Sequence, residues 1–148
     1  MIVSFFGHRD APDSIRTDLK KAIEILIMNK DAKEFLLGNQ GNFDRMVLDV
    51  IKEIKKEYPF IRYSVVLAYM PDKAHPCEKE ETILPEGIET VPKKYAILWR
   101  NKWMIQNSHA VVCYVNRSWG GAAKAVDYAK KQHRKIVHLP IYTHSDLW

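Results

Sequence analysis

Short apolar runs alternate along this chain with longer segments in which apolar residues recur every three or four positions. Five runs are apolar almost throughout, which is typical of strands buried on both faces of a parallel sheet: residues 2–6, 34–37, 63–69, 110–115 and 136–139. Helical spacing predicts helices over about 12–29, 43–57 and 92–107, and from 121 onward. The alternation predicts an α/β fold in which helices cover both faces of a mainly parallel, five-stranded sheet.

The expected sheet places three polar loops at one edge. We expect a single domain over residues 1–148, with strands ordered 3-2-1-4-5 when numbered along the chain. The chain then reverses direction between strands 1 and 4, and ligands of such sheets bind at the carboxyl ends of the strands beside the reversal. Gly7, His8 and Arg9 follow the first strand, residues 38–44 follow the second, and residues 116–121 follow the fourth. Their convergence predicts a binding site.

The loop at 38–44 is a candidate phosphate site. Gly38 and Gly41 let the backbone bring bare amides close to a ligand, and Asn39 and Asn42 suit the same turn. The helix that follows directs its unpaired N–H groups and positive dipole end at the loop. Asp44, in the first helical turn, could cap the helix, contact a sugar hydroxyl or orient a water. An ordinary tight turn would use the glycines equally well.

The other two loops carry further candidates, each with a plain structural alternative. Arg9 offers a planar fork for a phosphate or carboxylate, or a surface ion pair. His8 could bond a phosphate, transfer a proton or serve as a polar turn residue. Ser118, Gly120 and Gly121 precede a helix, where they could form a second anion site or allow close helix packing.

Composition limits the partners that we expect. With 47% hydrophobic and 28% charged residues, the chain resembles soluble globular proteins. Its net charge of +5 is spread over helix faces and forms no compact basic stripe, so we do not expect nucleic acid as the main partner. We find no apolar run of membrane-spanning length and no signal peptide, which predicts a cytoplasmic protein without a membrane partner.

The sequence offers little support for a disulfide framework, a zinc site or the common nucleotide-binding and hydrolase motifs. Cys77 and Cys113 are too few for a disulfide framework, and His75 and Cys77 lack the further ligands that zinc needs. The chain has no Walker lysine motif, no three-glycine dinucleotide fingerprint and no Gly-x-Ser-x-Gly elbow. We therefore expect no metal and no cofactor. Residues 70–91, which include three prolines, are predicted to be a long loop.

Several spaced motifs resemble the SLOG superfamily, Rossmann-like domains related to Lonely-Guy-type phosphoribohydrolases and to the core of DNA-processing protein A. They are Phe6-Gly7-His8-Arg9, the loop at 38–44, Tyr95 with Arg100-Asn101-Lys102-Trp103-Met104, and Gly120-Gly121-Ala122-Ala123. The segment from 82 to 104 is most similar to a small bacterial and phage branch of that group. The resemblance implies a Rossmann-like three-layer sandwich, nucleotide binding and a homodimer.

Hydrolases of the superfamily follow the fourth strand with Pro-Gly-Gly-x-Gly-Thr-x-x-Glu, after an arginine on the preceding helix. Arg100 matches that arginine, and the glycine pair matches, but Ala123 and Lys124 replace Gly-Thr and Asp127 replaces the glutamate. A shorter carboxylate and a lost hydroxyl would serve an oxocarbenium-like transition state poorly.

Our leading hypothesis is a nucleotide-binding or sensing domain. In it, the turn amides, Arg9 and Arg100 hold a phosphate, and Asp44 or Asn101 contacts the ribose. The alternative is a hydrolase of nucleotide N-glycosidic bonds that uses Asp44, Glu89 or Asp127. A nucleic-acid-binding module is a third, weaker hypothesis. Three tryptophans could belong to the core, a ligand-stacking surface or an oligomer interface: Trp99, Trp103 and Trp119.

Overall fold

Six strands, all paired in parallel, form one sheet in the order β4-β3-β2-β1-β5-β6. The computed structural model describes residues 1–70, 81–142 and 147. The strands are β1 Ile2–Gly7, β2 Glu34–Leu37, β3 Arg62–Val66, β4 Thr82–Ile83, β5 Ala110–Tyr114 and β6 Lys135–His138.

The expectation of five strands was wrong, because β4 was assigned to the long loop. The backbone N–H of Val65 donates to the carbonyl of Glu81 across 2.9 Å, and that of Leu67 donates to Ile83 across 2.8 Å. A strand of two residues is too short to show an alternating pattern in the sequence. Strand β4 exists only because it pairs with β3. The five expected strands keep their expected relative order within the sheet, although β3 ends at Val66.

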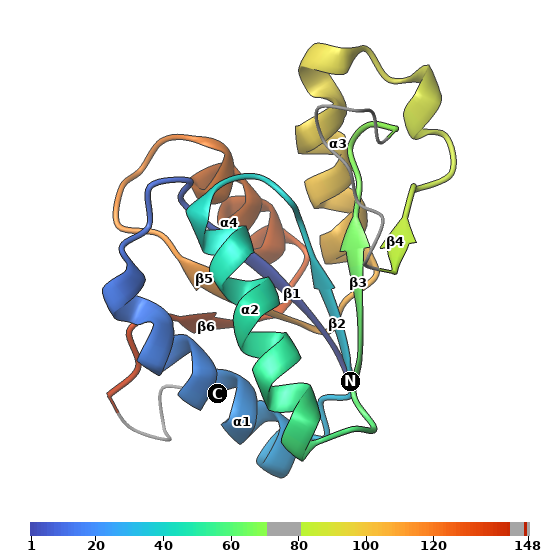
Figure 1. Cartoon of the computed structure of the whole chain (residues 1–148). Coiled ribbons are helices and arrows are strands. Elements are labelled where there is room, and N and C mark those ends of the chain that lie inside the picture. The colour runs from blue at the N-terminus through green and yellow to red at the C-terminus, as the bar shows by residue number, and fades with distance from the viewer. Residues whose placement is uncertain (71–80, 143–146, 148) are drawn as a thin grey trace.

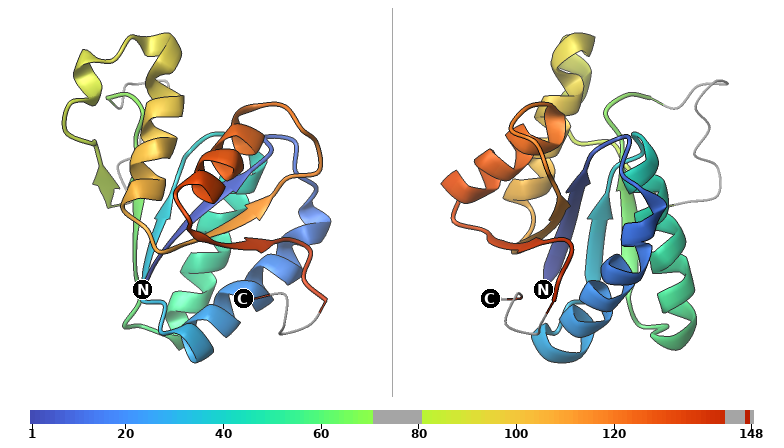
Figure 2. Two further views of the ribbon diagram at one scale, coloured as in Figure 1. Left: turned by 180° about the vertical axis from the view of Figure 1, so that it is seen from behind. Right: turned by 90° about the vertical axis from the view of Figure 1, so that its left-hand side faces the viewer.

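Two helices cover each face of the sheet (Figures 1 and 2). On one face lie α1 (Arg16–Lys30) and α2 (Asn42–Glu57), and on the other lie α3 (Lys93–Gln106) and α4 (Gly121–Lys131). Short 3-10 turns, η1 at Asp13–Ile15 and η2 at Ile88–Thr90, precede α1 and α3. None of the helices among the described residues combines the length and apolarity needed to cross a membrane.

Successive strand residues point to opposite faces of the sheet and so pack into two separate hydrophobic cores, one beneath each pair of helices. Phe5 and Phe35 are buried beneath α1 and α2, whereas their neighbours Phe6 and Leu36 join the core on the α3 and α4 side. The apolar face of α2 is the most regular, because six buried apolar residues follow helical spacing: Phe43, Met46, Val47, Val50, Ile51 and Ile54.

The loops that follow β1, β2 and β5 gather at one end of the sheet (Figure 1). A close approach between β1 and α2 contributes to this arrangement. A Cβ atom on Gly7 would lie 2.2 Å from the ring of Phe43, so only glycine lets the ring pack against the strand at this point. Gly7 therefore has a packing role irrespective of any ligand.

Candidate functional site

A cavity of about 260 Å³ lies where the three loops meet. Residues 5–9 line it from β1 and its loop, and Gly38, Gln40 and Asp44 line it from the segment after β2. Ile97, Arg100, Asn101 and Met104 line it from α3. Arg117 lines it from the loop after β5, and residues 120–122 line it from the start of α4. Residues far apart in sequence thus share one concave surface, as ligand sites commonly require.

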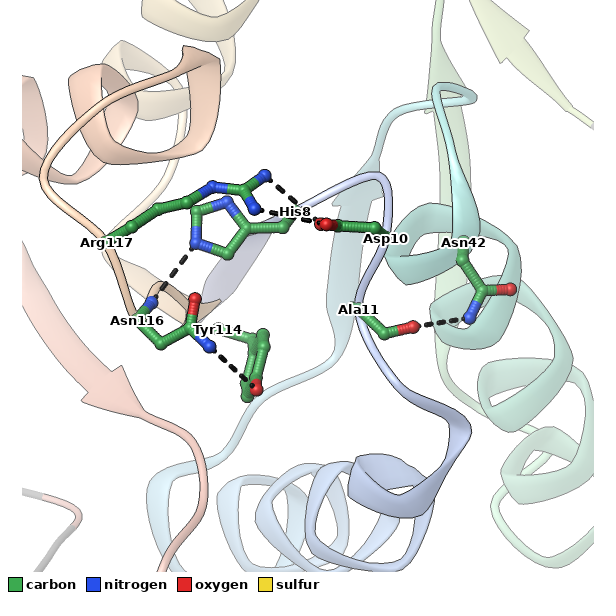
Figure 3. A network of polar contacts seen from close by, with 7 residues as sticks. All are labelled: His8, Asp10, Ala11, Asn42, Tyr114, Asn116 and Arg117. Carbon is green, nitrogen blue, oxygen red and sulfur yellow. Dashed lines mark hydrogen bonds and ion pairs between the residues drawn. The ribbon is translucent and has the colours of Figure 1, made fainter.

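Polar contacts join the loop after β5 to the loop after β1 (Figure 3). The backbone N–H of Asn116 donates to Nε2 of buried His8 across 3.1 Å. Both terminal nitrogens of Arg117 donate to the Asp10 carboxylate, each across 3.1 Å. Burial and the charge of Arg117 lower the pKa of His8, against the influence of Asp10. A neutral histidine with its proton on Nδ1 fits the acceptor role of Nε2.

The loop after β2 is fastened to the loop after β1 by Asn42 (Figure 3). Its side-chain amide donates to the Ala11 carbonyl across 2.7 Å and to Asp13 Oδ1 across 2.9 Å, and its backbone N–H donates to the Arg9 carbonyl. Gly41 has a φ of 91°, and a Cβ there would lie 2.5 Å from Cα of Arg9. Asn42 and Gly41 therefore hold the two loops together and do not line the cavity.

Asp44 and Arg100 both lie next to Gly38 and, with Asn101, form one side of the cavity, which we call the inner wall. A Cβ on Gly38 would lie 2.7 Å from Oδ2 of Asp44 and 3.0 Å from Nη1 of Arg100. Any larger residue would push these two charged groups out of place. The glycine thus permits a buried carboxylate and a buried guanidinium to share one wall of the cavity.

Burial dominates the electrostatics of this wall. It raises the pKa of Asp44 to about 6, although the charge of Arg100 and a hydrogen bond from the Gln40 N–H act in the opposite direction. That bond is 2.8 Å long, so Asp44 holds the loop before α2 in addition to lining the cavity. Burial also lowers the pKa of Arg100, whose Nη1 donates to the Val66 carbonyl and whose Nε donates to Asn101.

The beginning of α4 is more open than the beginning of α2. Gly120 has a φ of 95°, and no heavy atom would lie within 4 Å of a Cβ on Gly120 or on Gly121. The first N–H groups of a helix have no partner within the helix. By contrast, two amides of the 38–44 loop already donate to Asp44 and to the Arg9 carbonyl. Two amides of the 38–44 loop are therefore engaged within the protein, whereas open space surrounds the two glycines at the start of α4.

The cavity gathers nine of the residues singled out from the sequence: Gly7, His8, Arg9, Gly38, Asp44, Arg100, Asn101, Gly120 and Gly121. Four others belong to the same loops but do not line it: Asn39, Gly41, Asn42 and Ser118. Sequence reasoning missed the lining residues Gln40 and Arg117. The signal for Arg117 was present, because it is a basic residue within a glycine-bearing turn after a strand. The binding role of each of these residues stays a prediction.

The other two candidate carboxylates lie elsewhere. Glu89 is exposed in η2, beyond the cavity wall. Asp127 is exposed on α4, roughly 9 Å along the helix axis from Gly121. It lines a second cavity, of about 310 Å³ between α3 and α4, together with Lys102, Lys124 and Lys131. Of the acidic residues that the structure describes, Asp44 alone lines the first cavity.

The structure offers no obvious metal centre in the part of the chain that it describes, where no three His, Cys, Asp or Glu side chains come together. His75 and Cys77 lie outside the described residues. Cys113 is buried, which raises the pKa of its thiol to about 12, so it is poorly suited to nucleophilic chemistry.

Comparison with solved structures identifies the fold. DNA processing protein A (DprA) from Streptococcus pneumoniae is similar over 98% of this chain, with a TM-score of 0.70 and 13% identity. DprA from Helicobacter pylori, in a structure that concerns its single-stranded DNA binding mode, is similar over 97% of the chain, with a TM-score of 0.67 and 15% identity. The chain therefore has the Rossmann-like α/β fold that these DprA structures contain.

This likeness concerns the fold alone. The chain spans 52% of the Streptococcus protein and 67% of the Helicobacter protein. No protein-family model and no curated protein match the sequence. The resemblance to a bacterial and phage branch of the superfamily therefore stays a prediction.

Proposed function

We propose that this protein binds a nucleotide or nucleotide derivative through its phosphate in the cavity at the carboxyl ends of β1, β2 and β5. The observation that carries the proposal is the meeting of an open helix end with two guanidinium groups. Residues 120–122 of α4, Arg9 and Arg117 line the same cavity. Helix N-termini and arginine forks are both favourable partners of phosphate oxygens.

The inner wall suits the less charged part of such a ligand. Asn101 accepts a hydrogen bond from Arg100 through Oδ1, which leaves its Nδ2 hydrogens available to a ligand. Asp44 can accept from a hydroxyl group when it is ionised. Ile97 and Met104 add apolar surface beside these polar groups. A ribose between the phosphate seat and this wall would find both kinds of contact.

Isothermal titration calorimetry with a panel of nucleoside monophosphates and with inorganic phosphate tests the proposal. Arg9→Gln should weaken binding roughly 10- to 150-fold, the usual effect of losing a hydrogen bond to a charged group. Arg62→Gln is the matched control, because it removes the same charge from an exposed side chain at the start of β3. Absence of binding, or equal losses in both variants, would contradict the proposal.

A second candidate function is hydrolysis of a nucleotide N-glycosidic bond. The position of Asp44 favours it, since a buried carboxyl with a pKa of about 6 can act as an acid or a base near neutral pH. Incubation with nucleoside monophosphates should then release free base, and Asp44→Asn should abolish the release. A wild-type protein that binds the nucleotides and releases no base would exclude this function.

A third candidate is binding of single-stranded nucleic acid. The solved Helicobacter DprA structure concerns a single-stranded DNA binding mode, which does not favour our expectation against a nucleic-acid partner. The net charge of +5 is compatible with such a partner. Binding of oligothymidines that strengthens with length and weakens steeply with salt would support this function, because phosphate contacts release counterions. Affinity that is independent of length would instead favour a mononucleotide ligand.

A further inference from the structure

Trp119 is an exposed tryptophan in the loop between β5 and α4, close in sequence to residues that line the cavity. Its side chain is 65% exposed, although tryptophan is usually well buried. Trp99 and Trp103, by contrast, pack against apolar clusters on the α3 side of the sheet. Trp119 lies between Arg117 and Gly120, both of which line the cavity. An exposed aromatic ring at this point calls for an explanation.

The ring is held in place from one side. The guanidinium of Arg117 lies 4.4 Å from the ring centroid, within the range of a cation–π contact. The same guanidinium is fixed by its two bonds to Asp10. Because one face is covered by an anchored group, Trp119 presents a pre-oriented surface. Pre-orientation lowers the entropy cost of stacking a ligand on it.

Arg117 also has an unsatisfied donor. Its Nε is buried and has no acceptor within the described residues. Such groups are rare in folded proteins and often mark a missing partner.

We propose that Trp119 stacks on the aromatic base of the ligand and thereby selects nucleotides over sugar phosphates without a base. This inference rests on the proposed function. The phosphate lies at the start of α4, and the base turns outward onto the free face of the ring. Stacking strength grows with the overlapping aromatic surface, so affinity falls from purine to pyrimidine to no base.

Calorimetry with AMP, UMP and ribose 5-phosphate tests this assignment on the full chain. Trp119→Ala should weaken AMP binding roughly 5- to 150-fold, as expected for loss of one base–aromatic stack, and should leave ribose 5-phosphate unaffected. Trp119→Phe should restore most of the AMP affinity. Phe60→Ala is the control, because Phe60 is 56% exposed and precedes β3, at the opposite end of the sheet.

The possible results separate the two proposals. If the wild type binds none of the three ligands, the proposed function fails, and the stacking role fails with it. If AMP binds and Trp119→Ala has no effect, or if ribose 5-phosphate loses as much as AMP, only the stacking role is overturned. Analytical sedimentation of the ligand-free protein tests whether Trp119 instead contacts a second copy of the chain. If Trp119→Ala abolishes self-association and leaves the AMP affinity unchanged, the ring belongs to a dimer interface and the stacking role is overturned.

Discussion

The backbone N–H of Asn116 donates a 3.1 Å hydrogen bond to Nε2 of His8 and so joins the loop after β5 to the loop after β1. A ring nitrogen that accepts a hydrogen bond cannot carry a proton at the same time. Protonation of His8 would therefore break this link and weaken the contact between two walls of the cavity.

His8 should make stability fall in mildly acidic solution. Its folded-state pKa lies below the ordinary 6.5, so the unfolded chain takes up the proton first. The contribution of the neutral ring is present above pH 6.5 and is lost as the pH falls through the lower folded-state value. His8→Gln keeps an acceptor at the same point without titrating. Urea unfolding at pH 7.5 and pH 5 should show a larger loss for the wild type; equal losses would contradict this role.

Asp44 should act in the opposite direction. Burial raises its pKa from 3.8 to about 6, so its stabilising contribution is present below pH 3.8 and is lost as the pH rises through 6. The shift corresponds to roughly 3 kcal/mol. Between pH 4 and pH 7, the unfolding free energy of the wild type should fall by about that much relative to Asp44→Asn. A constant difference between the two proteins would show that the carboxyl is not desolvated.

Gly41 and Gly120 form a matched pair for testing the contact between loops. Both have backbone angles that side-chain-bearing residues rarely adopt, with φ of 91° and 95°. Substitution by alanine should cost about 1–3 kcal/mol from the backbone alone at each position. Gly41→Ala should cost a further 1–3 kcal/mol or so, because its Cβ would strike Arg9, whereas open space surrounds Gly120. Equal unfolding free energies for the two variants would contradict the close approach of the loops.

A substitution at Gly121 tests the proposed phosphate site at the start of α4 without destabilising the protein. No heavy atom lies within 4 Å of the position that its Cβ would take, and alanine favours helix formation more than glycine. Gly121→Ala should therefore unfold at the wild-type temperature or above. The added methyl group would nevertheless hinder a phosphate at the start of α4. Calorimetry should show at least about a tenfold loss of nucleotide affinity, and unchanged affinity would place the phosphate elsewhere.

The sequence predicts the frame of this site well because burial on both faces makes the long strands almost wholly apolar. Their ends place Arg9 and Gly38 at the same edge of the sheet, and helical spacing places Arg100 on α3. Those features depend on local pattern and on the general geometry of parallel sheets.

Features that depend on particular tertiary contacts could not be predicted. From the sequence, the side-chain amide of Asn42 was expected to bind a ligand. In the structure it donates instead to the Ala11 carbonyl and to the Asp13 carboxylate in the loop after β1. Asp127 lies at the expected position in a motif, but it faces the second cavity. Strand β4 exists only through its pairing with β3. The partners of Asn42 and of β4 are distant in sequence, so no local pattern reveals them.

The most direct test of the anion seat is a titration of ¹⁵N-labelled protein with AMP, monitored by amide chemical shifts. The largest shifts should fall on residues 7–9, 38–40 and 117–122, with little change in α1 or at the amino ends of the strands. Shifts that concentrate on the second cavity between α3 and α4, or no shifts at saturating AMP, would contradict a phosphate seat at the start of α4.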